Sequence, residues 1–326
     1  MAKNKRKLHP AVLLGFVCLL VFVISLVLGA TPLRLRQALE NPYSIDGLIL
    51  LHIRVPRVLT TLLCGAAFGT VGALLQCVLH NPLASPNVLG VNAGAGFGAT
   101  LLMAIIPHAG MAMVSFAAFA GAVVACLMVL QISRIAKSSR LALVLTGVAL
   151  TAFFRAGSDA LITLFPNSLT GSSHFSIGGA ANATLQSLIP LGIIVPVCVC
   201  AACLMYPQLD LLALGDDVAH SLGLNPQRIR TLALLLACAL AASGVAAMGL
   251  IGFVGLMAPH LVRLWVGSEN RLLLPLSALL GASMLMLCDL AARSLFSPFE
   301  LPVGVLLNFL GAPFFLFVLI RRRQYA

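Results

Sequence analysis

The feature that most constrains this sequence is a set of four long stretches without Asp, Glu, Lys or Arg, at residues 58–133, 160–209, 231–262 and 301–320. Moving one such charge to the centre of a bilayer costs at least about 2.5 to 3.5 kcal/mol. Only helices and closed barrels satisfy the backbone in lipid, and apolar runs of about 20 residues indicate helices. The sequence therefore predicts an all-α integral membrane protein with one transmembrane domain over residues 1–326.

Prolines, Gly-Asn clusters and charges divide the apolar material into ten predicted spans. The eighth span is short and rich in glycine, so a half-span joined to the seventh through Gly249, Gly252 and Gly255 stays open. An even number of spans places both termini on one side of the membrane. The spans are predicted at residues 11–31, 58–79, 88–106, 111–133, 141–165, 187–206, 229–249, 251–265, 272–295 and 302–320.

Basic residues are distributed unevenly between the two sides of this topology. The side that holds both termini carries 14 of the 20 Lys and Arg residues, so the positive-inside rule predicts cytoplasmic termini. The net charge of +11 does not indicate nucleic acid, because the basic residues flank apolar spans instead of forming a stripe with aromatic residues. Membrane lipid, not nucleic acid, is the predicted contact.

No set of residues in the sequence supports catalysis or metal binding. The sequence contains no Gly-Lys dipeptide, so it lacks the phosphate-binding loop that ATP hydrolysis by that route requires. Cys198, Cys200 and Cys203 have no His, Asp or Glu among them, which favours packing over a metal site. Ser243 and His260 lack a nucleophile motif and a neighbouring acid. We therefore predict no catalytic residue, no metal site and no cofactor bound by this chain.

A short cytoplasmic helix is predicted within residues 211–224. Leu214, Val218 and Leu222 recur every four residues and form an apolar ridge, while Gly223 ends the segment. The helix is too short to span a membrane, so another surface must cover its ridge. The residues alone leave three candidates open, namely the membrane surface, the rest of this chain and the groove of a cytoplasmic partner.

Three arginines are predicted on the outer side, with Arg54 and Arg57 before the second span and Arg293 at the end of the ninth. Long cationic side chains at such positions commonly extend toward the interface. Arg293 also stands four residues after Asp289, which allows a simple charge pair on one helix. Recognition of carboxylates on an external partner is the third interpretation.

Two further features concern helix contacts and turns. Gly90, Gly94 and Gly98 recur every four residues, which predicts a helix face on which a neighbouring backbone packs closely. The turn at residues 80–90 contains two prolines and two asparagines. Irregular backbone at membrane depth must be buried in protein or line a wet cavity, so this turn is either structural or part of a gate.

An ordered set of motifs from about residue 45 to 320 resembles the FecCD family of binding-protein-dependent permeases, which import iron-siderophores, heme and cobalamin. No single motif is decisive, but their order along the chain is specific. The matching residues are 54–57 (RVPR), Gln76, 81–86 (NPLASP), Leu89 and Gly90, 214–217 (LGDD), Leu222 and Gly223, 249–260 (GLIGFVGLMAPH), Arg263, Asp289, Arg293, 300–302 (ELP), Gly304 and 311–315 (GAPFF).

The resemblance implies ten helices per subunit, a homodimer around a central path, two cytoplasmic ABC ATPase subunits that hold ATP and Mg, and an extracytoplasmic substrate-binding lipoprotein. The implied location is the bacterial inner membrane, and the expected substrate is a ferric siderophore, with cobalamin or heme as alternatives. By resemblance, Arg54, Arg57 and Arg293 dock the binding protein, and Asn81 and Leu83 form a cytoplasmic gate. The implied coupling helices lie at about 209–225, with coupling residues Leu214, Gly215, Asp216, Asp217, Val218, Leu222 and Gly223.

An ion-coupled secondary transporter is the rival class. Such carriers usually place acidic groups near the middle of the bilayer. In this sequence Asp159 and Asp289 lie toward the ends of their predicted spans, and most spans contain no acid. The distribution of acidic residues therefore favours the ATP-driven importer, in which this chain is a transporter subunit without its own ATPase site.

Overall fold

The computed structural model describes residues 2–29, 31–135, 140–166, 177–295 and 299–323, and these residues form helices and connecting turns without a β-strand. The long helices follow from the apolar, charge-free spans, because a backbone in lipid has to satisfy its own hydrogen bonds. The helices are α1 (Ala2–Val27), α2 (Leu35–Glu40), α3 (Ile45–Leu48), α4 (Val55–Val78), α5 (Val91–Ile105), α6 (Met111–Ile135), α7 (Arg140–Leu164), α9 (Leu185–Leu204), α10 (Tyr206–Ala213), α11 (Asp216–Ser221), α12 (Pro226–Met248), α13 (Val254–Val266), α14 (Asn270–Ser294) and α15 (Val303–Arg323).

Each of the ten predicted spans coincides with one helix. Seven segments are long and apolar enough to cross a membrane: α1, the continuous segment Ile45–Val78 formed by α3, the π-helical turn Ile49–Arg54 and α4, then α6, α7, α9, α12 and α14. The apolar parts of α5, α13 and α15 are shorter, and α13 is short as predicted for the eighth span. The all-α membrane class is confirmed, whereas the count of ten crossings stays a prediction.

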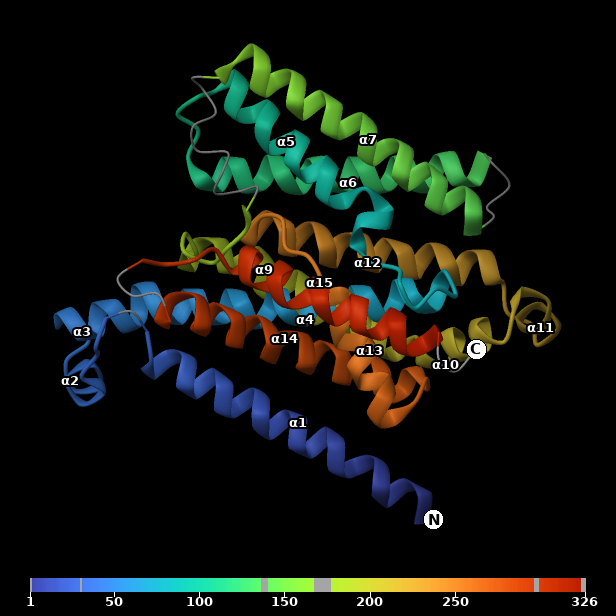
Figure 1. Cartoon of the computed structure of the whole chain (residues 1–326), viewed down its shortest axis with the longest axis horizontal. Helices are drawn as coiled ribbons and strands as arrows, with labels where there is room; N and C mark the ends of the chain where they lie inside the picture. The colour runs from blue at the N-terminus through green and yellow to red at the C-terminus, as the bar shows by residue number, and fades with distance from the viewer. Residues whose placement is uncertain (1, 30, 136–139, 167–176, 296–298, 324–326) are drawn as a thin grey trace.

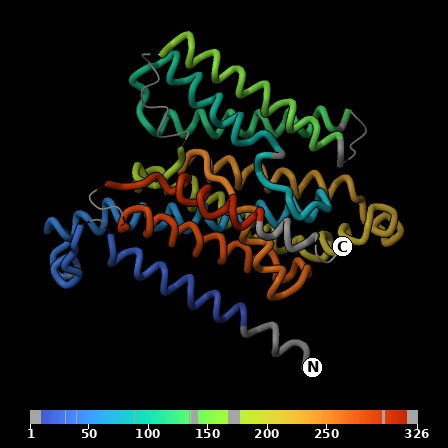
Figure 2. Tube along the Cα trace, in the orientation of Figure 1, coloured from blue at the N-terminus to red at the C-terminus, as the bar shows by residue number. Residues whose placement is uncertain are grey.

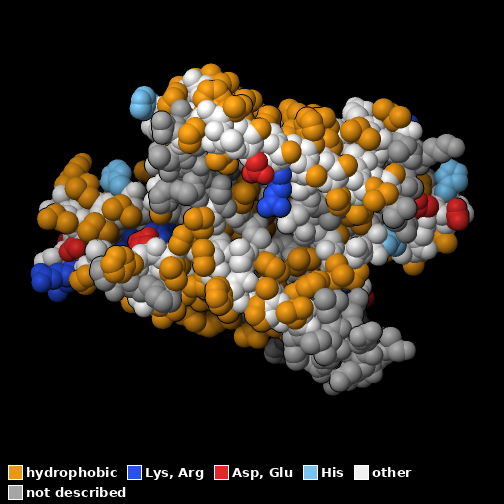
Figure 3. All heavy atoms as spheres, turned by 45° about the horizontal axis from the view of Figure 1, so that its top comes forward, with side chains coloured by type: hydrophobic (Ala, Val, Ile, Leu, Met, Phe, Trp, Pro, Cys, Tyr) orange, Lys and Arg blue, Asp and Glu red, His pale blue; other side chains and the backbone are white. Residues whose placement is uncertain are grey.

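The helices pack around a buried α4, which contacts α14, α12, α13 and α9 (Figure 1). Helices α5, α6 and α7 pack on one another as a separate layer, and α1 rests against α14 on the opposite side (Figures 1 and 2). Few residues of α1, α7 and α9 are buried inside the chain, and Figure 3 shows hydrophobic side chains over much of one face. Such an apolar surface is suited to lipid.

The two ends of the molecule differ. Helices α10 and α11 lie at one end, where α1 begins and α15 finishes (Figure 1). The end of α1, the short helices α2 and α3 and the start of α4 lie at the other end. This arrangement separates the two groups of residues that the sequence singles out.

Glycines bring α5 and α6 into close contact. A Cβ added at Gly94 would lie 2.5 Å from the carbonyl oxygen of Gly121, and one at Gly98 would lie 2.3 Å from that of Ala117. Gly90 does not belong to this packed face, contrary to the prediction. It precedes α5 with φ +66°, a left-handed conformation that glycine adopts without steric cost, and a Cβ added there would lie no closer than 3.6 Å to a neighbouring atom, Oγ1 of Thr151.

Candidate functional site

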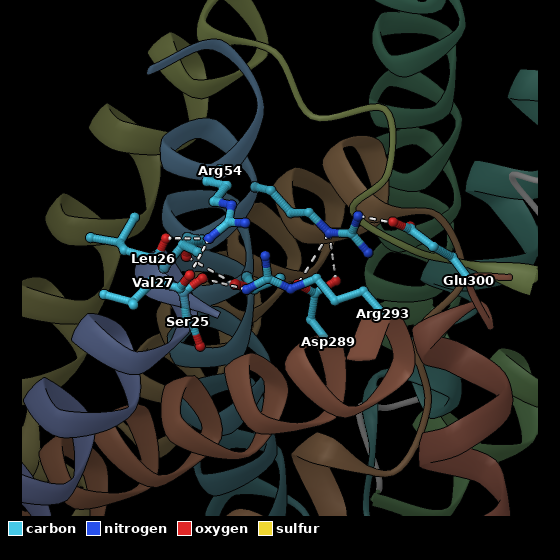
Figure 4. A network of polar contacts seen from close by, with 10 residues as sticks. Ser25, Leu26, Val27, Arg54, Asp289, Arg293 and Glu300 are labelled. Carbon is cyan, nitrogen blue, oxygen red and sulfur yellow. Dashed lines mark hydrogen bonds and ion pairs between the residues drawn. The ribbon is translucent and has the colours of Figure 1, made fainter. Parts of the chain in front are cut away.

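A cluster of charged side chains lies at the end of the molecule where α4 begins and α14 finishes (Figure 4). Arg57 donates from Nε to both carboxylate oxygens of Asp289, at 2.9 and 3.1 Å. Its Nη1 donates to Oε2 of Glu300 at 2.8 Å. Asp289 also forms an ion pair with Nε of Arg293 at 3.4 Å. The cluster thus joins α4, α14 and the segment that leads into α15.

The remaining donors of the cluster bind the end of α1. Arg54 donates from Nη1 to the carbonyl oxygens of Leu26 and Val27 and from Nη2 to that of Thr31, and Arg293 donates to the carbonyl oxygen of Ser25. The last carbonyl groups of a helix lack intrahelical partners, and cations are stabilised beside them. Arg54 and Arg293 therefore fasten α1 to the cluster.

Burial distinguishes one member of the cluster from the others. The side chains of Arg57, Arg293 and Asp289 are 8%, 4% and 2% exposed, whereas that of Glu300 is 38% exposed. These arginines are therefore paired within the chain and do not extend toward the membrane interface. The two carboxylates pair with Arg57 and Arg293, whereas the guanidinium group of Arg54 binds backbone carbonyl oxygens and interacts electrostatically with Asp46. Glu300, which binds Nη1 of Arg57, is the point at which an external acid can reach the cluster.

Glu300 is the member of the cluster to which the sequence interpretation gave no role. A signal was present, because Glu300 is the only charged residue between Arg293 and Arg321. An isolated acid in apolar sequence needs a cationic partner, and the outer arginines were the available ones.

The opposite end of the molecule carries the three residues of the predicted apolar ridge. Leu214, Val218 and Leu222 are 63%, 43% and 59% exposed. The segment is not one helix, because α10 and α11 are separated at Gly215, which has φ +112°. Leu214 precedes α11 for this reason, while Gly223, with φ +82°, follows its end as predicted.

Two carboxylates hold the α10–α11 segment to the long helices. Asp216 at the start of α11 forms an ion pair at 2.9 Å with Arg230 of α12, whose side chain is 5% exposed. Asp210 in α10 accepts hydrogen bonds from the backbone and the side-chain nitrogen of Asn270, the first residue of α14, at 2.9 and 2.8 Å. Asp217 is exposed, and its coupling role stays a prediction.

The turn after α4 lies beside this segment. Asn81 accepts a hydrogen bond from the backbone nitrogen of Leu83 at 2.9 Å, which shapes the turn, and Leu83 is 40% exposed. A ring nitrogen of His80 lies 3.1 Å from the carbonyl oxygen of Leu212 in α10. Near the same end, Gln76 accepts a hydrogen bond from Arg263 of α13. The structure therefore brings the predicted gate residues next to the predicted coupling segment.

No group of three or more metal-ligating side chains occurs among the described residues. A helical membrane body with a charged cluster at one end and exposed apolar side chains on a short helical segment at the other fits a membrane transport subunit. The chain belongs to the FecCD transport family, whose model matches residues 17–321.

Similar proteins cover nearly the full chain. The Fe(3+)-citrate import system permease protein YfmE of Bacillus subtilis is 36% identical, over 97% of this chain and 96% of the relative. The hemin transport system permease protein HmuU of Yersinia pestis is 34% identical, over 98% of both chains. A solved structure described as an inward-facing metal-chelate type ABC transporter is 30% identical with a TM-score of 0.85, over 96% of this chain and 99% of that one.

Proposed function

We propose that this chain is the membrane-spanning permease subunit of a binding-protein-dependent ABC importer for a metal chelate, with a ferric siderophore as the first candidate. Heme and cobalamin are the alternatives. The observation that carries the proposal is the combination, in one helical membrane body, of a largely buried cluster of arginines and acids at one end and the exposed apolar side chains of Leu214, Val218 and Leu222 at the other. The names of the iron-citrate and hemin relatives support the substrate class.

In this proposal the two ends have different partners. A substrate-binding lipoprotein outside the cell docks over Arg54, Arg57 and Arg293 through its carboxylates. Two ABC ATPase subunits in the cytoplasm, which hold ATP and Mg, receive the ridge formed by Leu214, Val218 and Leu222 in their grooves. Two copies of the chain form a homodimer in the bacterial inner membrane, with the path between them and all termini in the cytoplasm.

The mechanism follows from the contacts of the α10–α11 segment. Closure of the ATPase dimer moves α11, and the ion pair of Asp216 with Arg230 passes this motion to α12. The hydrogen bonds of Asp210 to Asn270 pass it to α14. Because α12 and α14 both pack on α4, the three helices shift together and open the outer and inner sides of the path alternately. Asn81 and Leu83 close the inner side.

Reconstitution tests this proposal. Proteoliposomes that contain the chain, the cognate ATPase and the binding protein are expected to accumulate the ferric siderophore only when ATP is present on the side of the membrane that carries the ATPase. A proton or sodium gradient without ATP is expected to give no uptake. Uptake driven by such a gradient, in the absence of the ATPase, would assign the chain to the secondary transporters instead.

The proposed docking mode predicts a gain of affinity when Glu300 is replaced. Glu300 holds Nη1 of Arg57, so an incoming carboxylate has to compete with it. We expect Glu300→Gln to tighten binding of the lipoprotein about fivefold, equivalent to about 1 kcal/mol, measured by surface plasmon resonance on the permease complex. Arg57→Gln is expected to weaken the same binding at least tenfold.

The matched control is Glu40→Gln. Glu40 also pairs with an arginine, Arg36, at 2.8 Å, and α2 lies at the same end of the molecule as the cluster, but this pair is exposed. We expect unchanged binding in the control. Equal binding by wild type, Glu300→Gln and Arg57→Gln would remove the docking role from the cluster.

A further inference from the structure

Helix α4 ends in a hydrogen-bonded turn that places His80 in an unusual conformation. The backbone nitrogens of His80 and Asn81 donate to the carbonyl oxygens of Cys77 and Gln76, both at 3.2 Å. This is the Schellman pattern, whose first residue after the helix cap has a positive φ and is usually glycine. His80 occupies that position with φ +50°. A side chain there is sterically strained, so a glycine would relieve the backbone.

The ring of His80 makes a contact that a glycine could not make. One ring nitrogen lies 3.1 Å from the carbonyl oxygen of Leu212. Because a carbonyl only accepts, this nitrogen carries the proton and donates. Leu212 is in the last turn of α10, and its carbonyl oxygen also accepts a hydrogen bond from the backbone nitrogen of Gly215 at 3.2 Å, so the histidine side chain adds a further donor that links this helix end to the turn. The thiol of Cys77 lies 3.5 Å from the carbonyl oxygen of Leu209, which adds a second contact between α4 and α10.

The contact between His80 and Leu212 lies between two segments that the proposed function uses. On one side, Leu212 lies in the segment that continues into α11, with its exposed Val218 and Leu222. On the other side, Asn81 and Leu83 follow His80 directly in the turn. The carboxylate contacts of Asp210 and Asp216 connect the same segment to α14 and α12, but they do not reach this turn. His80 thus connects the short cytoplasmic helices to the turn itself.

We propose that His80 is a positioning residue. It makes the turn after α4, which holds Asn81 and Leu83, follow α10 when the ATPase moves α11. Strained residues persist where surrounding contacts require them, and they concentrate at functional sites. The hydrogen bond of the His80 side chain is a contact of this kind, because it joins α10 to the turn and depends on direction. The inference rests on the proposed function, in which the α10–α11 segment couples the ATPase to the gate formed by Asn81 and Leu83.

The informative variant is His80→Gly, which removes the ring and relieves the backbone. We expect the folded complex to be at least as heat-stable as wild type and to retain its ATPase subunits. The number of ATP molecules hydrolysed per siderophore imported in proteoliposomes should rise at least threefold. His80→Gln, whose amide can still donate to Leu212, should lie between His80→Gly and wild type. His108→Gly, which changes an exposed histidine in the turn after α5, is the matched control and should behave as wild type.

The outcomes separate the inference from the function on which it rests. A wild-type ratio of ATP to siderophore in His80→Gly, with or without a change in heat stability, would overturn the positioning role while the transport function stands. If the wild-type complex shows no ATP-driven uptake, the proposed function itself fails. A raised ratio in His108→Gly as well would also overturn the role, because the effect would then not depend on the contact with Leu212.

Discussion

Replacing Asp289 with Asn is expected to lower the free energy of unfolding of the chain by about 3 kcal/mol, because a buried charge pair loses one partner. Asp289 is the carboxylate shared by Arg57 and Arg293, and its side chain is 2% exposed. The amide keeps the shape of the carboxylate but removes one negative charge from two buried guanidinium groups, which leaves Arg57 with Glu300 and Arg293 with the carbonyl oxygen of Ser25. The expected loss is large compared with the effect of most substitutions.

The measurement is thermal unfolding of the detergent-solubilised chain, followed by binding of the lipoprotein to the fraction that stays folded. Glu300→Gln is the matched control, because it also removes a carboxylate from Arg57 but at a site where solvent screens the charge. It should cost less than about 1 kcal/mol. Equal destabilisation by the two variants would show that Asp289 is not the centre of the cluster.

Lipid made the helices of this chain predictable from its sequence. Charge-free runs have few alternatives to a helix in a bilayer, so the spans predicted at 111–133 and 229–249 coincide closely with α6 and α12. The glycine spacing likewise predicts the close packing of Gly94 and Gly98, because only glycine lets two backbones approach so closely. These features depend on residues near one another in sequence.

The contacts that build the two candidate sites could not be predicted in the same way. Arg57 and Asp289 are 232 residues apart, and their pairing depends on the packing of α4 on α14. The pair of Asp289 and Arg293 on one helix was among the predicted alternatives, because its spacing of four residues is a local pattern.

Local backbone conformations were missed for another reason. The break between α10 and α11 depends on the positive φ of Gly215 alone. The regular spacing of Leu214, Val218 and Leu222 predicts one continuous helix and therefore gives no sign of this break. The strained turn at His80 has no sequence signal, because glycine or asparagine would normally mark such a position. The role proposed for His80 depends on its contact with Leu212 of α10, which only the folded chain brings together.

A negative charge at Val218 is expected to abolish ATP-driven uptake. In the proposed complex Val218 of α11 is buried in an apolar groove of the ATPase, where an unpaired carboxylate costs several kcal/mol. A cost of about 3 kcal/mol corresponds to a loss of more than 100-fold in affinity. Val218→Asp should therefore release the ATPase subunits during purification and reduce uptake at least tenfold. The chain itself should fold normally, because Val218 is 43% exposed.

Val218→Thr is the matched control, since threonine has nearly the shape of valine and carries no charge. It should retain its ATPase subunits and at least half of the wild-type uptake rate, which separates the effect of charge from that of shape. Co-purification with the ATPase and siderophore uptake would be measured on the same preparations. If Val218→Asp kept its ATPase subunits and transported at the wild-type rate, the ridge would not face the ATPase. Residues Leu214 and Leu222 would then need another covering surface, of which the membrane is the remaining candidate.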